Sequence, residues 1–176
     1  MRHKQPGFTL IELIITLAIA AILMAVAIPS FQSFVLNNRI SAQANDFMAS
    51  IGLTRSEAVK RATRVTICKS ANGTSCATAG SWAQGWIVFI DGSTAGLVDG
   101  IDAVLQVRGP LEGANTFAGT GSSVSFVAYE ATGYMTALPG RIALCPPSPA
   151  AVEGRDIVIT NTGRARVQSP PTTACA

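Results

Sequence analysis

The chain has 176 residues, of which 48% are hydrophobic and 13% charged, with 13 lysines and arginines against 10 acids. This near balance excludes broad attraction of polyanions, so any nucleic-acid binding must come from a local patch. The single histidine, His3, lies at the extreme N-terminus, and the four cysteines lack the paired C-x₂₋₄-C spacing of a zinc site. The sequence therefore predicts no metal, no cofactor and no catalytic residue.

The first apolar segment follows a basic stretch, residues 1–7, and covers residues 8–28, with Glu12 as its only charge. A secretory signal peptide has its small-residue cleavage site after the apolar region, whereas Gly7 lies before it. A helix of 21 residues covers about 31 Å, close to the thickness of the hydrocarbon core of a bilayer. We expect this segment to cross a membrane, where an acid such as Glu12 is costly and usually functional.

The apolar pattern resumes beyond Pro29 and predicts an amphipathic helix over residues 31–63. The positions expected to face a core recur at intervals of three, four and seven residues. They are Ile40, Ala44, Phe47, Ile51, Ala58 and Ala62. The positions expected on the opposite, polar face are Arg39, Gln43, Asp46, Arg55, Lys60 and Arg64.

After Arg64 the chain changes to short β-branched and aromatic runs separated by glycine, proline, asparagine and aspartate. Such runs predict strands. They cover residues 65–69, 85–90, 104–108, 124–129, 141–145, 155–160 and 164–168. The expected fold is α+β, with the long helix packed on an antiparallel sheet or a small two-sheet sandwich in one domain.

The four cysteines favour disulfides, because a domain beyond the membrane segment would lie in an oxidising compartment. Three connectivities are open. We favour the pairing of neighbours in sequence, Cys68 with Cys76 and Cys145 with Cys175. The first bond would close a glycine-containing loop, and the second would hold a proline-rich tail.

Three acids, Asp91, Asp99 and Asp102, follow the second predicted strand and could be taken for calcium ligands. Residues 91–95 lack the alternating oxygen ligands of a calcium loop, and aspartate beside glycine is common in turns. A structural turn is the better interpretation.

Residues 157–167, IVITNTGRARV, are typical of two strands joined by a turn at Gly163. Side chains alternate along a strand, so Arg164 and Arg166 share a face roughly 6.6 Å apart, and each could hold a phosphate. Arg141 or Arg155 could assist. The alternative is structural: exposed arginines protect an edge strand from aggregation, and Gly163 is only a turn residue.

Residues 7–12, GFTLIE, resemble the processing and assembly motif of type IV pilins and type II secretion pseudopilins. The resemblance implies that prepilin peptidase cleaves between Gly7 and Phe8 and methylates the new amino terminus on Phe8. It also implies that Glu12 pairs with the amino terminus of a neighbouring subunit, where two buried charges offset each other's desolvation. The alternative is an ordinary membrane anchor with an incidental glutamate.

Residues 54–68, together with 85–92 and 99–107, are similar to the helix-to-strand junction and central hairpin of the GspH and FimT/FimU branch of minor pilins. The sequence from Gly163 to Arg166 also fits the GRxR element with which FimT-type minor pilins bind DNA during uptake by transformable bacteria.

The expected organisation is a leader peptide (1–7), a hydrophobic assembly helix (8–28), the amphipathic half of the same helix (29–64) and a periplasmic β-rich domain (65–176). The resemblance implies a minor pilin, held by one pass in the inner membrane and then assembled with other pilin subunits into a pilus on the cell surface. The alternative is a minor pseudopilin of the type II secretion system. An anchored enzyme is disfavoured, because cleavage removes the only histidine and no serine has a G-x-S-x-G setting.

Overall fold

The computed structural model describes residues 7–100, 102–121, 124–136, 140–147, 152–169, 171 and 175. Residues 1–6 of the predicted leader and most of the predicted loop over residues 169–176 lie outside this part of the chain. The contacts divide the molecule into two compact units, Met1–Leu36 and Asn37–Ala176.

A single helix, α1, runs from Leu10 to Arg61 and continues through Pro29. The Ser33 hydroxyl donates a hydrogen bond of 3.1 Å to the carbonyl oxygen of Pro29. The helix is long enough, and its N-terminal half apolar enough, to cross a membrane, and this apolar stretch is unburied. The first unit consequently offers an uncovered apolar helix for a membrane or another subunit to cover.

The buried face of α1 in the second unit contains five of the predicted apolar positions, from Ile40 to Ala58. Two predictions for this helix were wrong. Gln43, expected on the polar face, is buried, because it accepts a hydrogen bond from Asn115 (2.6 Å) and donates one to the carbonyl of Glu112 (2.8 Å). Buried polar groups are stable when they are paired in this way. Ala62, expected in the core, is exposed just past the helix end in a left-handed conformation, with φ of 51°.

Four antiparallel strands form the first sheet, sheet A, in the order β3-β2-β1-β5. Their bounds are Val65–Lys69 (β1), Trp86–Ile90 (β2), Val104–Arg108 (β3) and Phe126–Tyr129 (β5). A short 3₁₀ helix, η1 (Trp82–Gln84), precedes β2. The hairpin of β2 and β3 lies where the sequence predicts it.

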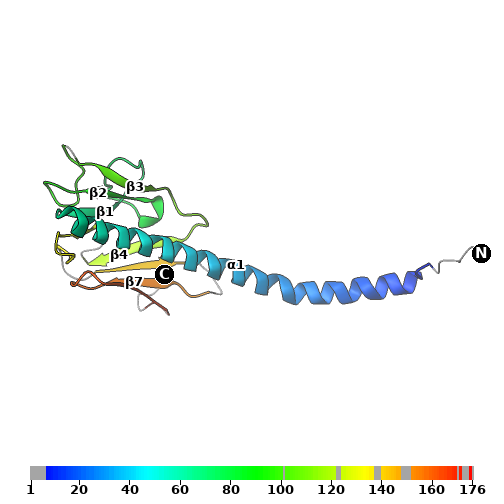
Figure 1. The fold of residues 1–176 in the computed structure, drawn as a ribbon. Coiled ribbons are helices and arrows are strands. Elements are labelled where there is room, and N and C mark those ends of the chain that lie inside the picture. Colours follow the sequence, from blue (N-terminus) through cyan, green and yellow to red (C-terminus); the bar gives the residue numbers. More distant parts are fainter. Residues whose placement is uncertain are drawn as a thin grey trace, which may run out of the picture. The chain divides into compact units, whose positions relative to one another are not determined.

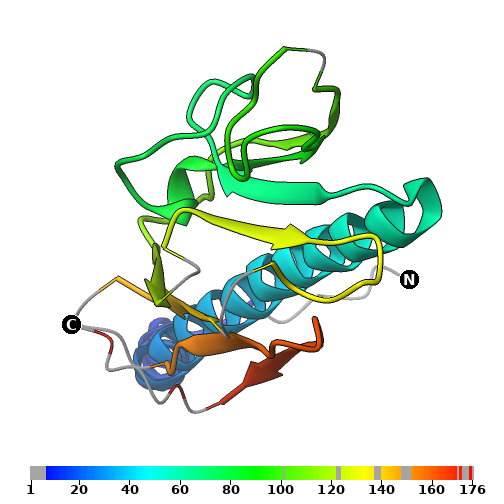
Figure 2. The same cartoon turned by 90° about the vertical axis from the view of Figure 1, so that its left-hand side faces the viewer.

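The second sheet, sheet B, has the order β4-β6-β7-β8 and is also antiparallel. Its strands are Thr116–Gly121 (β4), Gly140–Cys145 (β6), Arg155–Ile159 (β7) and Ala165–Gln168 (β8). Strand β4 was not predicted, because its sequence TFAGTG has two glycines and one large apolar residue, Phe117. Figures 1 and 2 show sheet A on one side of the C-terminal half of α1 and sheet B on the other.

Phe47 of α1 lies at the centre of the core. Its ring contacts Trp82, Trp86 and Phe117 edge to face, with centroids 4.9 to 5.1 Å apart. The Trp86 indole N–H also donates to the Ser50 hydroxyl on α1 at 3.0 Å. The buried hydrophobic residues of the described chain lie between Ile40 and Ile159, so the second unit contains its own complete core.

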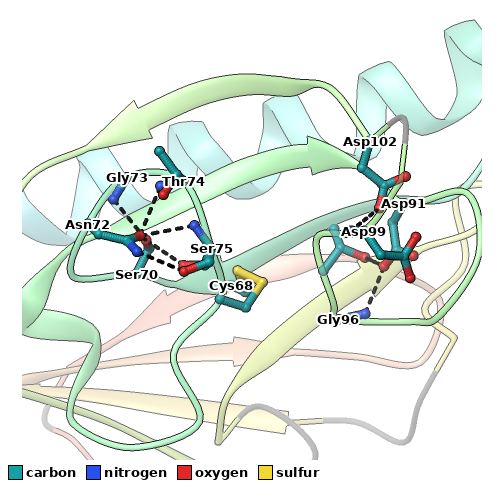
Figure 3. The surroundings of a disulfide bond; sticks show 12 residues. Cys68, Ser70, Asn72, Gly73, Thr74, Ser75, Asp91, Gly96, Asp99 and Asp102 are labelled. Atoms are coloured by element: carbon teal, nitrogen blue, oxygen red, sulfur yellow. Dashed lines mark hydrogen bonds between the residues drawn. A yellow bond between two sulfur atoms is a disulfide. The ribbon is translucent and has the colours of Figure 1, made fainter.

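Two disulfides join Cys68 to Cys76 and Cys145 to Cys175, with S–S distances of 2.02 and 1.97 Å. The first closes the loop after β1, where the Asn72 side-chain oxygen accepts from the backbone N–H groups of Thr74 and Ser75 (Figure 3). This loop is therefore held both covalently and by its own hydrogen bonds.

The acids that could be taken for calcium ligands organise the connection between β2 and β3 (Figure 3). Asp91 is buried and accepts hydrogen bonds from Arg64 (2.9 Å), Thr66 (2.6 Å) and the backbone of Gly96 (2.8 Å). Asp102 accepts from the backbone N–H groups of Gly92 and Asp99 at 3.1 Å. Among the described residues, no group of three or more His, Cys, Asp and Glu side chains could hold a metal ion.

Candidate assembly and nucleic-acid-binding sites

The start of α1 is closed by a reciprocal cap between Thr9 and Glu12. The Glu12 carboxylate accepts hydrogen bonds from the Thr9 backbone N–H (2.9 Å) and hydroxyl (3.0 Å). The Glu12 backbone N–H donates in return to the Thr9 hydroxyl at 3.3 Å. This is a capping box, which satisfies backbone donors that an α-helix leaves unpaired at its N-terminus.

The segment ahead of this cap is open to other molecules. Phe8 is 92% exposed, and Gly7 precedes the helix. Both residues lie outside the helix and are exposed, so the bond between Gly7 and Phe8 is open to solvent. The T-x-x-E spacing of Thr9 and Glu12 is visible in the sequence, and it could have predicted the cap.

The second site is the hairpin of β7 and β8, which residues 160–164 connect. The turn is closed by hydrogen bonds from the Gly163 N–H to the Thr160 carbonyl (2.8 Å) and from the Thr160 N–H to the Arg164 carbonyl (2.9 Å). Gly163 has φ of +77°, a left-handed conformation that glycine adopts without strain.

The turn is held against the rest of the second unit at two points. The Tyr129 hydroxyl, at the end of β5, donates to the Gly163 carbonyl at 3.1 Å. Arg55 of α1 donates to the Thr162 carbonyl at 3.2 Å. Burial raises the pKa of Tyr129 to about 12, although the nearby positive charge of Arg55 opposes this shift. Sequence patterns carry no signal for these two residues, because both contacts join segments distant in the chain.

Arg164 and Arg166 extend from this turn with exposed side chains. Within the part of the chain that the structure describes, neither guanidinium makes a hydrogen bond or an ion pair. Arg166 is in register with Val158, which is in register with Arg141 on β6, so Arg141 and Arg166 lie on the same face of sheet B. Arg141 forms an ion pair of 3.5 Å with Asp156.

Arg155 does not join this group. It shares its face of β7 with the buried residues Ile157 and Ile159, opposite the face of Arg166. Its guanidinium donates to Asn37 (2.9 Å), Ser169 (3.1 Å) and nearby backbone carbonyls. Of the two proposed helpers, the structure therefore brings only Arg141 to the arginines of the turn.

Comparison with protein families gives two matches. Residues 43–163 match the model of the family described as type II transport protein GspH. Residues 2–28 match the prokaryotic N-terminal methylation motif. Together the two matches cover the apolar segment, sheet A and strands β4, β6 and β7 of sheet B, and they end at Gly163, before Arg164 and strand β8.

Curated relatives match through a short segment. The type IV major fimbrial protein FimA of Dichelobacter nodosus is 49% identical over 41 residues, which are 23% of this chain and 26% of FimA. The fimbrial protein EcpC of Eikenella corrodens is 44% identical over 45 residues, 26% of this chain and 29% of EcpC. The chain thus spans only about a quarter of the length of the curated relatives that it matches.

Solved structures match over most of the fold. The type IV minor pilin FimU of Pseudomonas aeruginosa has a TM-score of 0.63 and 19% identity, over 80% of this chain and 98% of FimU. The minor pseudopilin EpsH of the type II secretion system of Vibrio cholerae has a TM-score of 0.54 and 12% identity, over 75% of this chain and 98% of EpsH. At these identities the likeness shows the fold alone.

Proposed function

Since this chain belongs to the family of the type II transport protein GspH, we propose that it acts as a FimT/FimU-like minor pilin that binds DNA. The chain is a minor pilin or pseudopilin of a type IV pilus or of a type II secretion system. Such proteins are structural rather than enzymatic. They are anchored in a membrane by the N-terminal helix, processed by prepilin peptidase and assembled with other pilins.

The proposed assembly uses the first unit. Cleavage between Gly7 and Phe8 leaves a methylated amine on Phe8, and Glu12 exchanges its Thr9 partner for the amine of a neighbouring subunit. Residues 8–28 lie in the inner membrane before assembly, and the β-rich domain lies in the periplasm. The unburied apolar half of α1 supports this proposal, because a neighbouring subunit must cover it once it leaves the membrane.

The observation that carries the proposed DNA binding is the exposed pair Arg164 and Arg166 on a turn that Gly163 shapes and the second unit holds. Neither guanidinium has a partner among the described residues, so both are available to phosphate oxygens, which guanidiniums bind in a bidentate manner. Contact of this kind goes to the DNA backbone, tolerates any sequence and weakens steeply with salt.

The test is a titration of labelled duplex DNA with the full chain in a neutral detergent, over a series of salt concentrations. Replacing both arginines by glutamine, R164Q/R166Q, should lower affinity at least tenfold and reduce the salt slope by about 2, roughly one for each phosphate contact. The control is K60Q/R61Q, which removes two exposed charges at the end of α1 and should leave both values unchanged. If R164Q/R166Q also leaves both unchanged, the hairpin is not a DNA site.

A second candidate function is that of a minor pseudopilin in type II secretion, which the match to the family of the type II transport protein GspH supports. Deletion of the gene in its own bacterium separates the two. Loss of DNA uptake with normal protein secretion supports the pilus role, and the reverse result supports the secretion role.

A further inference from the structure

We propose that the phosphate-binding surface continues from the β7–β8 turn across the outer face of sheet B to Arg141. A DNA duplex would then lie across β8, β7 and β6 instead of touching the β8 edge alone. This inference rests on the proposed DNA binding by Arg164 and Arg166, and it adds a third anchor and a direction to that site.

The strand register places the anchors in one row. Arg166 of β8 is paired with Val158 of β7, Val158 with Arg141 of β6, and Arg141 with Thr120 of β4. Residues that are directly opposite in antiparallel strands point to the same face of the sheet. These four residues, which we call the outer row, therefore cross the whole width of sheet B.

The spacing in the outer row fits a chain of phosphates. Neighbouring strands lie roughly 4.8 Å apart, so two strand intervals separate the backbone positions of Arg141 and Arg166 by about 10 Å, while those of Arg164 and Arg166 are about 6.6 Å apart along the chain. The three arginines thus start from backbone positions that are spread over a triangle wider than a single phosphate. A continuous backbone can contact all three, whereas inorganic phosphate can occupy only one or two of them.

Among the described residues, the surface of sheet B beside Arg141 has no protruding side chain that would keep a ligand away. A shallow hollow beside Arg141 is lined by Thr120, Val158 and the glycines Gly121 and Gly140. The two glycines are paired in register and contribute only backbone to the lining of this hollow. Val158 is half-buried, so the middle of the outer row does not hold a bulky backbone away from the arginines.

The carboxylate next to Arg141, Asp156, lies on the same face of β7 as Val158, but it is shielded from solvent. The Asp156 side chain is completely buried, whereas the Arg141 side chain is 36% exposed. Asp156 can therefore orient the guanidinium while the charge that reaches the surface is positive. Because the ion pair offsets part of that charge, we expect Arg141 to contribute less to DNA affinity than Arg166.

The first test replaces Arg141 in the full chain and measures binding of the same labelled duplex. R141Q should lower affinity three- to tenfold and reduce the salt slope by about 1, whereas R141K, which keeps the charge and the pairing with Asp156, should retain the slope. Arg108 supplies the matched control: it is also an exposed arginine paired with an aspartate, Asp46, but it lies in sheet A, and R108Q should bind like the wild type.

The second test leaves the buried ion pair intact. Thr120→Glu puts a negative charge at the far end of the outer row and should weaken binding at least threefold. Thr116→Glu makes the same change on the same face of β4, four residues from Thr120, where the strand pairs with the disulfide-bonded Cys145. It should have a much smaller effect. Inorganic phosphate should compete only at concentrations far above those of duplex phosphate.

The outcomes separate the two proposals. If R164Q/R166Q weakens binding while R141Q and Thr120→Glu do not, the site is confined to the turn and the extension is wrong, although DNA binding stands. If none of the variants changes binding, both proposals are wrong. Loss of affinity and slope in R141Q, together with weaker binding by Thr120→Glu than by Thr116→Glu, establishes the outer row as part of the site.

Discussion

Replacement of Gly163 by alanine tests whether the arginine turn is held as the structure describes. A Cβ at this position would lie 2.3 Å from the Gly133 carbonyl oxygen and 2.7 Å from a ring carbon of Tyr129. The left-handed conformation of Gly163 costs a residue with a side chain about 1 to 2 kcal/mol. Moving the turn to relieve the contacts would also break the hydrogen bond from Tyr129, worth about 1 kcal/mol. We therefore expect a loss of about 2 to 3 kcal/mol in the free energy of unfolding.

The measurement is urea unfolding of residues 31–176, a fragment that retains all the buried hydrophobic side chains of the described chain. Gly52 supplies the matched control, because it is an exposed helical glycine at which an added Cβ would meet nothing within 4 Å. Gly52→Ala should stabilise the fragment by up to about 1 kcal/mol, since alanine favours the helix. R164Q/R166Q should remain within about 0.5 kcal/mol of the wild type, because exposed side chains contribute little.

The reasoning is refuted if Gly163→Ala unfolds within about 0.5 kcal/mol of the wild type. The turn would then accommodate a Cβ at position 163 despite the short distances to Gly133 and Tyr129. If the variant is destabilised but binds DNA with the wild-type salt slope, the position of the turn does not determine how the arginines reach phosphate.

Three further changes have defined outcomes. Tyr129→Phe should lower the free energy of unfolding by about 1 kcal/mol. Because the pKa of Tyr129 is about 12 in the folded protein and about 10 in the unfolded chain, the tyrosine's contribution to stability is complete below pH 10 and is lost as the pH rises toward 12. Urea midpoints measured over this pH range should therefore fall less in the variant than in the wild type. C145S/C175S should lower the free energy of unfolding by about 3.5 kcal/mol, because the bond closes a loop with a sequence separation of 30 residues and so lowers the entropy of the unfolded chain. Urea unfolding of the variant is compared with that of the oxidised wild type. Glu12→Gln should leave membrane insertion intact but reduce recovery of the subunit in sheared fibres, and normal recovery would contradict the assembly proposal.

Much of the fold is visible in the sequence, because burial imposes a period on it. The helical spacing of Ile40, Ala44 and Phe47 and the alternation of Ile157 and Ile159 in β7 each reflect one buried face. Strand β4 escaped prediction because Phe117 is its only large apolar residue, and pairing with β6 rather than local preference makes it a strand. Gln43 was misplaced for a similar reason, since its partner Asn115 lies 72 residues further along the chain.

The candidate site likewise contains residues that a local sequence pattern predicts and residues that only the tertiary structure brings together. Alternation alone places Arg164 and Arg166 on one face, and both side chains are exposed. The position of Arg141 depends on the register of three strands, which no local pattern specifies. The support that Arg55 and Tyr129 give to the turn depends on tertiary packing and is equally invisible in the sequence.

The arrangement around Phe47 also provides a natural spectroscopic reporter. The chain has two tryptophans, and both stack edge to face on the same phenylalanine, where the helix meets both sheets. Their fluorescence therefore reports on the packing of α1 against sheet A and sheet B around Phe47. Helix melting followed by circular dichroism and the tryptophan signal should coincide in one transition, as in cooperative two-state unfolding, without any added label.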